Sequence, residues 1–100
     1  MEKNSRLFYN DVTEVYNKLL LFCAANGLKA KERGDKFYFI EAKKSSLLFW
    51  KNIRLELEIM LVDKTQVKVT CKAFRFWMRQ PRAEIAFVAA IEDYINAAIE

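Results

Sequence analysis

Two stretches in the middle of the chain alternate strictly between apolar and polar residues. In residues 53–61 the odd positions are Ile or Leu, and the even positions are Arg, Glu or Met. In residues 67–74 the odd positions run from Val67 to Ala73, and Lys, Thr and Phe occupy the even ones. Successive side chains of a strand point to opposite faces of a sheet, so this pattern predicts two strands with one buried face each. The polar residues Asp63, Lys64 and Thr65 predict the turn between them.

Two other stretches carry apolar residues at helical spacing. The first helix is predicted to start at Asp11, a capping residue with Glu14 three positions on, and to end at Asn26-Gly27. Its predicted apolar face consists of Val12, Val15, Tyr16, Leu19, Leu20, Phe22 and Cys23. The second helix is predicted to open at Gln80-Pro81, because Pro is well tolerated at the first helical position. Its predicted apolar face consists of Phe87, Val88, Ile91, Tyr94, Ile95, Ala98 and Ile99, and we expect Glu84, Asp93 and Asn96 to face away from the core.

The remaining segments predict shorter strands. Residues 5–9 form a weak strand candidate, and residues 28–33 and 36–44 form a strand pair around a turn at Gly34-Asp35. The register of the second of these is open: either Tyr38, Ile40 and Ala42 point inward and leave Phe37 and Phe39 outward, or the reverse.

The element order is therefore (β)-α-β-β-β-β-α in one domain spanning residues 1–100. Strands joined by short turns between two helices predict an α+β class: a two-layer domain with an antiparallel sheet of four or five strands and both helices on one face. This order resembles the TATA-binding-protein-like and Bet v 1-like (helix-grip) architectures, in which a curved antiparallel sheet packs against a helix and a long C-terminal helix. The resemblance rests on element order alone and carries over no functional residue.

Composition narrows the chemistry. The chain has 100 residues, of which 53% are hydrophobic, with no His and only two Cys, Cys23 and Cys71. Without His there is no Ser-His-Asp or Cys-His arrangement, and two thiols are too few for a zinc site within one chain. We therefore expect a protein that is not an enzyme and uses no cofactor or metal. The longest apolar runs are far shorter than the roughly 20 residues of a membrane span, so we expect a cytoplasmic protein with no integral membrane segment.

If both helices cover one face of the sheet, the opposite face is a candidate contact surface. Residues 64–82 contain six Lys or Arg and no acidic residue, and aromatic residues are interleaved with these cations. Large exposed apolar patches usually mark interaction sites. The predicted interaction surface consists of Trp50, Arg54, Lys68, Lys72, Phe74, Arg75, Phe76, Trp77 and Arg79.

Several interpretations of this surface stay open. A bulge near Ala73 would instead turn part of Phe74, Phe76 and Trp77 into the core. If the residues are exposed, the best hypothesis is a small non-catalytic binding or assembly module that contacts a protein partner or a second copy of itself as a homodimer. The first alternative is a nucleic-acid-binding domain that uses the basic aromatic segment 74–79. The second is a carrier of a small apolar ligand, held between the C-terminal helix and the sheet.

Overall fold

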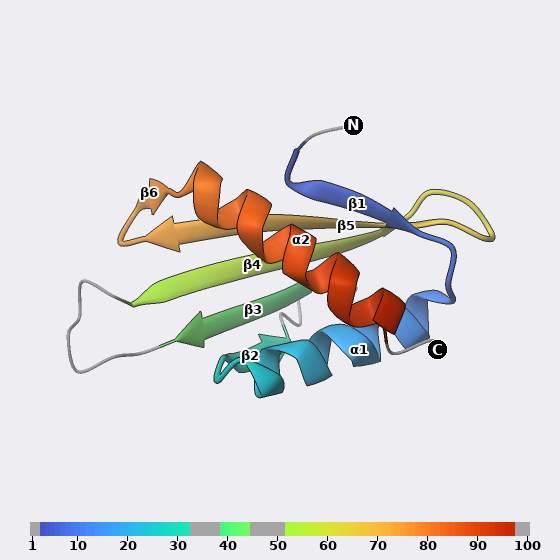
Figure 1. The fold of residues 1–100 in the computed structure, drawn as a ribbon, viewed down its shortest axis with the longest axis horizontal. Helices are drawn as coiled ribbons and strands as arrows, with labels where there is room; N and C mark the ends of the chain where they lie inside the picture. Colours follow the sequence, from blue (N-terminus) through green and yellow to red (C-terminus); the bar gives the residue numbers. More distant parts are fainter. Residues whose placement is uncertain (1–2, 33–38, 45–51, 98–100) are drawn as a thin grey trace.

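The computed structural model describes residues 3–32, 39–44 and 52–97 (Figure 1). Along the chain these residues form β1 (Ser5–Phe8), α1 (Val12–Ala25), β2 (Lys29–Glu32), β3 (Phe39–Lys44), β4 (Ile53–Leu61), β5 (Val67–Arg75), β6 (Met78–Arg79) and α2 (Pro81–Ala97). The strands pair antiparallel in the order β1-β5-β4-β3-β2, and the short β6 also pairs with β5. The α+β class and the element order agree with the sequence prediction, and β6 adds a short strand that the sequence did not indicate.

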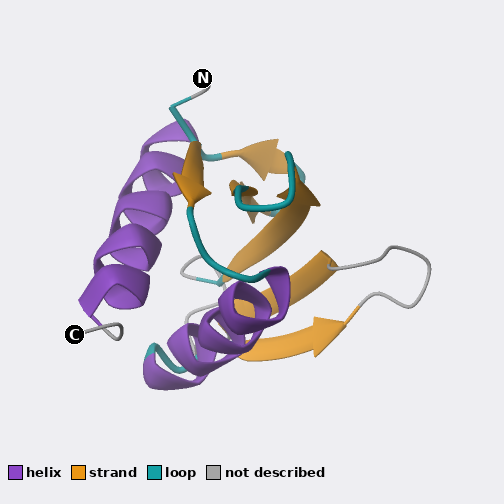
Figure 2. Ribbon diagram, turned by 90° about the vertical axis from the view of Figure 1, so that its right-hand side faces the viewer, coloured by secondary structure: helices purple, strands orange, loops and turns teal. Residues whose placement is uncertain are grey.

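Both helices pack on one face of the sheet (Figure 2). The side chains that alternate inward from β4 and β5 meet the apolar faces of the helices in one core, in which Leu19, Leu57, Cys71 and Ile91 are fully buried. The helices also contact each other: the ring of Phe22 on α1 meets the ring of Tyr94 on α2 edge-on at a centroid distance of 5.7 Å.

The pairing of β4 with β5 places the odd-numbered positions of the two strands beside each other on one face and the even-numbered positions beside each other on the other face. Leu57 lies beside Cys71 on the buried face, and Glu56 lies beside Lys72 on the opposite, open face. β5 keeps this alternation through Ala73, which is buried, so the structure contains no bulge there. The pattern fails at Leu61, the last residue of β4, which we predicted to be buried but which is 55% exposed even though its partner Val67 is buried.

The predicted boundaries of the first helix and the predicted start of the second are correct to within a residue. The Asp11 carboxylate accepts a hydrogen bond from the Thr13 N–H and caps α1, and Gly27 follows the helix with a left-handed φ of 69°. Glu14 accepts a hydrogen bond of 2.8 Å from the Lys18 ammonium, one helical turn further on. α2 begins at Pro81 as predicted.

The register of β3 follows the first of the two alternatives, because Ile40 and Ala42 are both fully buried. The predicted orientations of Phe37, Tyr38 and the Phe39 side chain lie outside the described part of the chain, as do Trp50, Ala98 and Ile99.

Candidate functional site

The strands β5 and β6 form a tight hairpin, which we call the aromatic hairpin (residues 74–79). Phe74 pairs with Arg79 and Arg75 pairs with Met78, which leaves a turn of two residues, Phe76 and Trp77. Phe76 has a φ of 59° and is the one non-Gly residue in the described ranges with a left-handed backbone. Two-residue hairpin turns usually place Gly, Asn or Asp at such positions. A side chain with a Cβ is strained there by roughly 1–2 kcal/mol.

The tip of this hairpin is apolar and exposed. Phe76 is 55% exposed, Trp77 82% and Met78 53%, although each is a large hydrophobic residue. The two rings at the tip contact each other at a centroid distance of 6.1 Å and an angle of 50°. The alternative in which Phe76 and Trp77 belong to the core is therefore wrong for this chain.

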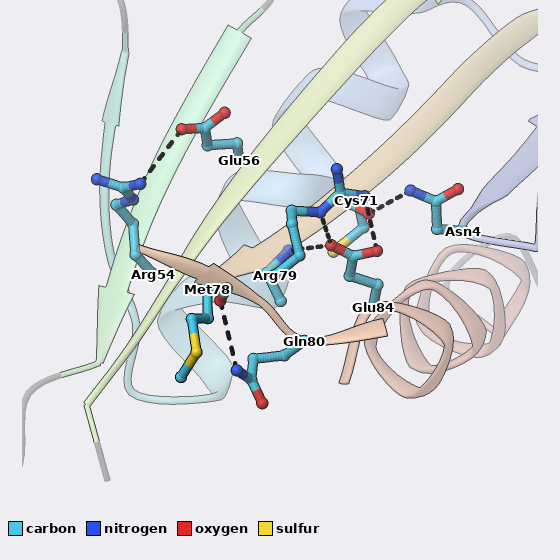
Figure 3. A network of polar contacts seen from close by, with 9 residues as sticks. Asn4, Arg54, Glu56, Cys71, Met78, Arg79, Gln80 and Glu84 are labelled. Carbon is cyan, nitrogen blue, oxygen red and sulfur yellow. Dashed lines mark hydrogen bonds and ion pairs between the residues drawn. The ribbon is translucent and has the colours of Figure 1, made fainter. Parts of the chain in front are cut away.

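The base of the hairpin is fixed by Glu84, in the first turn of α2 (Figure 3). The Glu84 Oε2 atom accepts hydrogen bonds from the backbone N–H of Ala73, at 3.0 Å, and from Nε of Arg79. The Oε1 atom accepts a second bond from the Arg79 guanidinium, through Nη2 at 2.9 Å. The Gln80 N–H also donates to the Ala73 carbonyl oxygen, at 2.9 Å. Strand, hairpin and helix are thus tied together at one carboxylate.

The burial of Glu84 corrects our prediction that it faces away from the core, because only 3% of it is exposed. The reason lies at the edge of β5. Along that edge, β1 pairs with residues 67–70 and β6 pairs with residues 74–75. Between them, Asn4 exchanges hydrogen bonds with the backbone N–H and carbonyl of Cys71. The N–H of Ala73 lies between these partners and donates its hydrogen bond to the Glu84 carboxylate, where a strand would have offered a backbone carbonyl. A buried backbone donor requires such an acceptor.

The environment of Glu84 keeps it ionised. The hydrogen bond from the Arg79 side chain lowers the pKa of the carboxyl below its usual value, and the Ala73 N–H and the charge of Lys72 act in the same direction. Burial opposes this shift but is outweighed. The hydrogen bonds that Glu84 accepts from Arg79 and Ala73 are therefore charge-assisted at neutral pH.

A second pair of contacts surrounds Phe74 on the open face. The guanidinium carbon of Arg54 lies 4.7 Å from the centroid of the Phe74 ring, and that of Arg79 lies 5.9 Å from it. Arg54 also lies 3.9 Å from a carboxylate oxygen of Glu56. The structure thus brings Arg54, Phe74 and Arg79 of the predicted surface into direct contact.

The described part of the open face of the sheet is strongly charged. One cross-strand row runs through Lys31, Glu41, Glu56 and Lys72, with acidic residues in its centre. Of the aromatic residues expected here, Phe74 is the one whose side chain the structure describes on this face. Lys68 lies six residues along β5 from Phe74, beside Met60 and Leu7, and does not join the hairpin. Of the remaining predicted residues, Arg75 is exposed in the hairpin and Trp50 lies outside the described residues.

The two thiols lie in the core. Burial raises the pKa of Cys23 to about 11 and that of Cys71 to about 12, so both are protonated at neutral pH and are poor nucleophiles. Among the described residues, no three His, Cys, Asp or Glu side chains gather in a way that could bind a metal ion.

Sequence reasoning missed two features of the site. One is the role of Glu84, for which the available signal was its place as the first acidic residue after the basic run of residues 64–82. The other is the strained turn, since a sequence Phe-Trp carries none of the usual marks of a two-residue hairpin.

None of the helices in the described ranges has the length and apolar character needed to span a bilayer. Comparison of the chain with protein-family models and with curated proteins finds no match.

Proposed function

We propose that this chain is a non-catalytic binding module and that the aromatic hairpin is its contact element. The single observation behind the proposal is that the chain holds Phe76 in a strained conformation while leaving Phe76 and Trp77 exposed. Strain of this kind persists only where the surrounding structure imposes it, and it is concentrated at functional sites. Phe76 is 55% exposed and Trp77 is 82% exposed, so both rings keep most of their surface available to a partner.

The anchoring of the hairpin supports this proposal. Glu84 binds Ala73, directly before the hairpin, and Arg79, the last residue of the hairpin. Arg54 packs against the ring of Phe74, the first residue of the hairpin. The tip is consequently presented from a rigid base. A rigid, pre-ordered tip loses little conformational entropy on binding, which is the usual advantage of aromatic anchors in interfaces.

The open sheet face supports a contact surface smaller than the one predicted from the sequence. On the described part of that face, Lys29, Lys31, Lys43, Arg54, Lys68 and Lys72 outnumber the acidic residues Glu41, Glu56 and Glu58. A homodimer that placed two such faces together would bring like charges into opposition, which is unfavourable. We therefore assign the contact to the hairpin and not to the whole face.

Site-specific photo-crosslinking tests this assignment without requiring the partner to be known. A photoreactive phenylalanine analogue is placed at position 77 or, as the matched control, at Leu61. Leu61 is 55% exposed but lies at the end of β4, beside Val67 at the end of β5 that is far from the hairpin. Both proteins are irradiated in cells that express the chain naturally, and mass spectrometry identifies protein, lipid and nucleic-acid adducts. We expect a discrete adduct from position 77 alone. Adducts of equal yield at both positions, or none at position 77, would contradict the proposal.

A further inference from the structure

We propose that the aromatic hairpin docks on the surface of an anionic lipid bilayer, with its tip inserted at the level of the headgroups. This inference rests on the proposed function and names its partner. It starts from the chemistry of the tip: Phe76, Trp77 and Met78 are consecutive, apolar and more than half exposed. No polar side chain stands between them to hydrogen-bond to the edges of nucleic-acid bases. An apolar surface of this kind, with Trp as its most exposed member, suits the interfacial layer of a membrane, where Trp is enriched.

The charges around the tip point to an anionic surface. Arg75 and Arg79 flank the three apolar residues, and Arg82 follows in the first turn of α2. Residues 72–85 contain four cations and one carboxylate, a net charge of +3. Arg75 and Arg82 are both exposed, whereas the Arg79 guanidinium binds Glu84. Basic residues beside an apolar insertion are attracted to the negative potential of anionic lipids.

The length of the turn matches a shallow insertion. Phe76 and Trp77 lie one strand residue, or about 3 Å of backbone, beyond the paired Arg75 and Met78, and both carry exposed rings. Interfacial elements bury their apolar side about 5–10 Å into the boundary between headgroups and acyl chains. A tip this short reaches only the outer part of this layer, which keeps Arg75 close to the level of the phosphates. Ile85, 39% exposed and next to Glu84, adds an apolar side chain to the same end of the molecule.

The opposite end of the sheet provides an internal comparison. Met60, Leu61 and Val62 are also exposed apolar residues, at the turn between β4 and β5. That turn continues with Asp63 and Lys64, which together carry no net charge. Exposed apolar residues are thus present at both ends, but among the described turns a net charge of +3 accompanies only the aromatic hairpin.

Vesicle flotation tests the proposal with the full chain. The probes are phosphatidylcholine vesicles with and without phosphatidylserine, at low and at physiological salt. We expect binding that requires phosphatidylserine and weakens as salt rises, because exposed charges are screened. The double variant Phe76→Ser with Trp77→Ser should bind at least about tenfold more weakly. Arg75→Gln should bind about fivefold more weakly. The matched control, Leu61→Ser with Val62→Ser, should bind as the unmodified chain does, and circular dichroism establishes that each variant is folded.

Three results would overturn the lipid proposal: no binding of the folded chain to vesicles with phosphatidylserine, equal binding to both kinds of vesicle, or an equal loss in the control variant. Binding of a single-stranded oligonucleotide or of a protein through position 77, without vesicle binding, would also overturn it. In that case the hairpin remains the contact element and the proposed function stands. Crosslinking that does not favour position 77 would instead remove the proposed function itself.

Discussion

The strained turn predicts that Gly at position 76 gives a more stable chain than Ala, which is the opposite of the order at an ordinary position. Phe76→Ala removes the ring but keeps the Cβ atom, and Phe76→Gly removes the Cβ atom as well. Because φ at this position is 59°, the backbone strain depends on the Cβ atom and not on the ring. Comparison of the two variants with each other therefore isolates the backbone term from the loss of ring contacts.

The expected magnitude follows from two opposing effects. The left-handed conformation costs a residue with a Cβ atom about 1–2 kcal/mol, and the additional freedom of unfolded Gly costs about 0.5–1 kcal/mol. We expect Phe76→Gly to be more stable than Phe76→Ala by about 0.5–1 kcal/mol. At Trp77, where φ is not positive, the same comparison should favour Ala over Gly by about 0.5–1 kcal/mol.

Gly27 provides the converse test. Its φ is 69°, and a Cβ atom built there meets no heavy atom within 4 Å, so Gly27→Ala changes the backbone term without a clash. We expect it to lower the free energy of unfolding by about 0.5–1 kcal/mol. Equilibrium urea unfolding followed by circular dichroism measures all five variants. If Phe76→Ala proves more stable than Phe76→Gly, the turn is not strained and the reasoning that assigns a function to it is refuted.

Further predictions concern the anchor and the sheet. Replacement of the anchoring carboxylate by Glu84→Gln should destabilise the chain by about 1.5–3 kcal/mol at neutral pH, because it weakens charged hydrogen bonds to Arg79 and to the Ala73 N–H. The pKa of Glu84 is lower in the folded chain than in the unfolded one, so the stability that its charge contributes is present above the unfolded pKa and is lost as pH falls through the folded pKa. Urea unfolding from neutral to acidic pH should therefore show a smaller loss of stability in Glu84→Gln than in the unmodified chain. Parallel plots of stability against pH would contradict this. Leu57→Ala, at a fully buried position of β4, should lower the free energy of unfolding by about 2–5 kcal/mol. The neighbouring Glu56→Ala, on the open face, should change it by less than about 0.5 kcal/mol, and equal losses in a urea titration would show that β4 does not have one buried face.

Most of the fold could be predicted because local patterns and tertiary packing agree. The alternation of β4 and β5 and the end of α1 at Gly27 each follow from a local rule that the structure obeys. Leu61 departs from its pattern because alternation assigns a face to a residue but does not say how well that face is covered at the end of a strand.

The candidate site was less predictable, since its features are settled by tertiary contacts. Helical periodicity places Glu84 among polar positions, whereas its burial follows from tertiary contacts with the Ala73 N–H at the edge of β5 and with Arg79. Similarly, Phe76 and Trp77 have no turn propensity that would identify a two-residue hairpin, and pairing of Phe74 with Arg79 imposes the conformation on them. The residue types of the surface were visible in the sequence, but its rigid, strained presentation was not.

The most direct test of the central claim is the solvent access of Trp77 in the free chain. A Trp50→Phe background leaves one indole, whose quenching by acrylamide is measured over a range of protein concentrations. We predict quenching close to that of a free tryptophan derivative in water, as expected for a side chain that is 82% exposed at the tip of the hairpin. A protected indole in the folded monomer would contradict the account, because the hairpin would then be part of the chain's own packing and not a contact element.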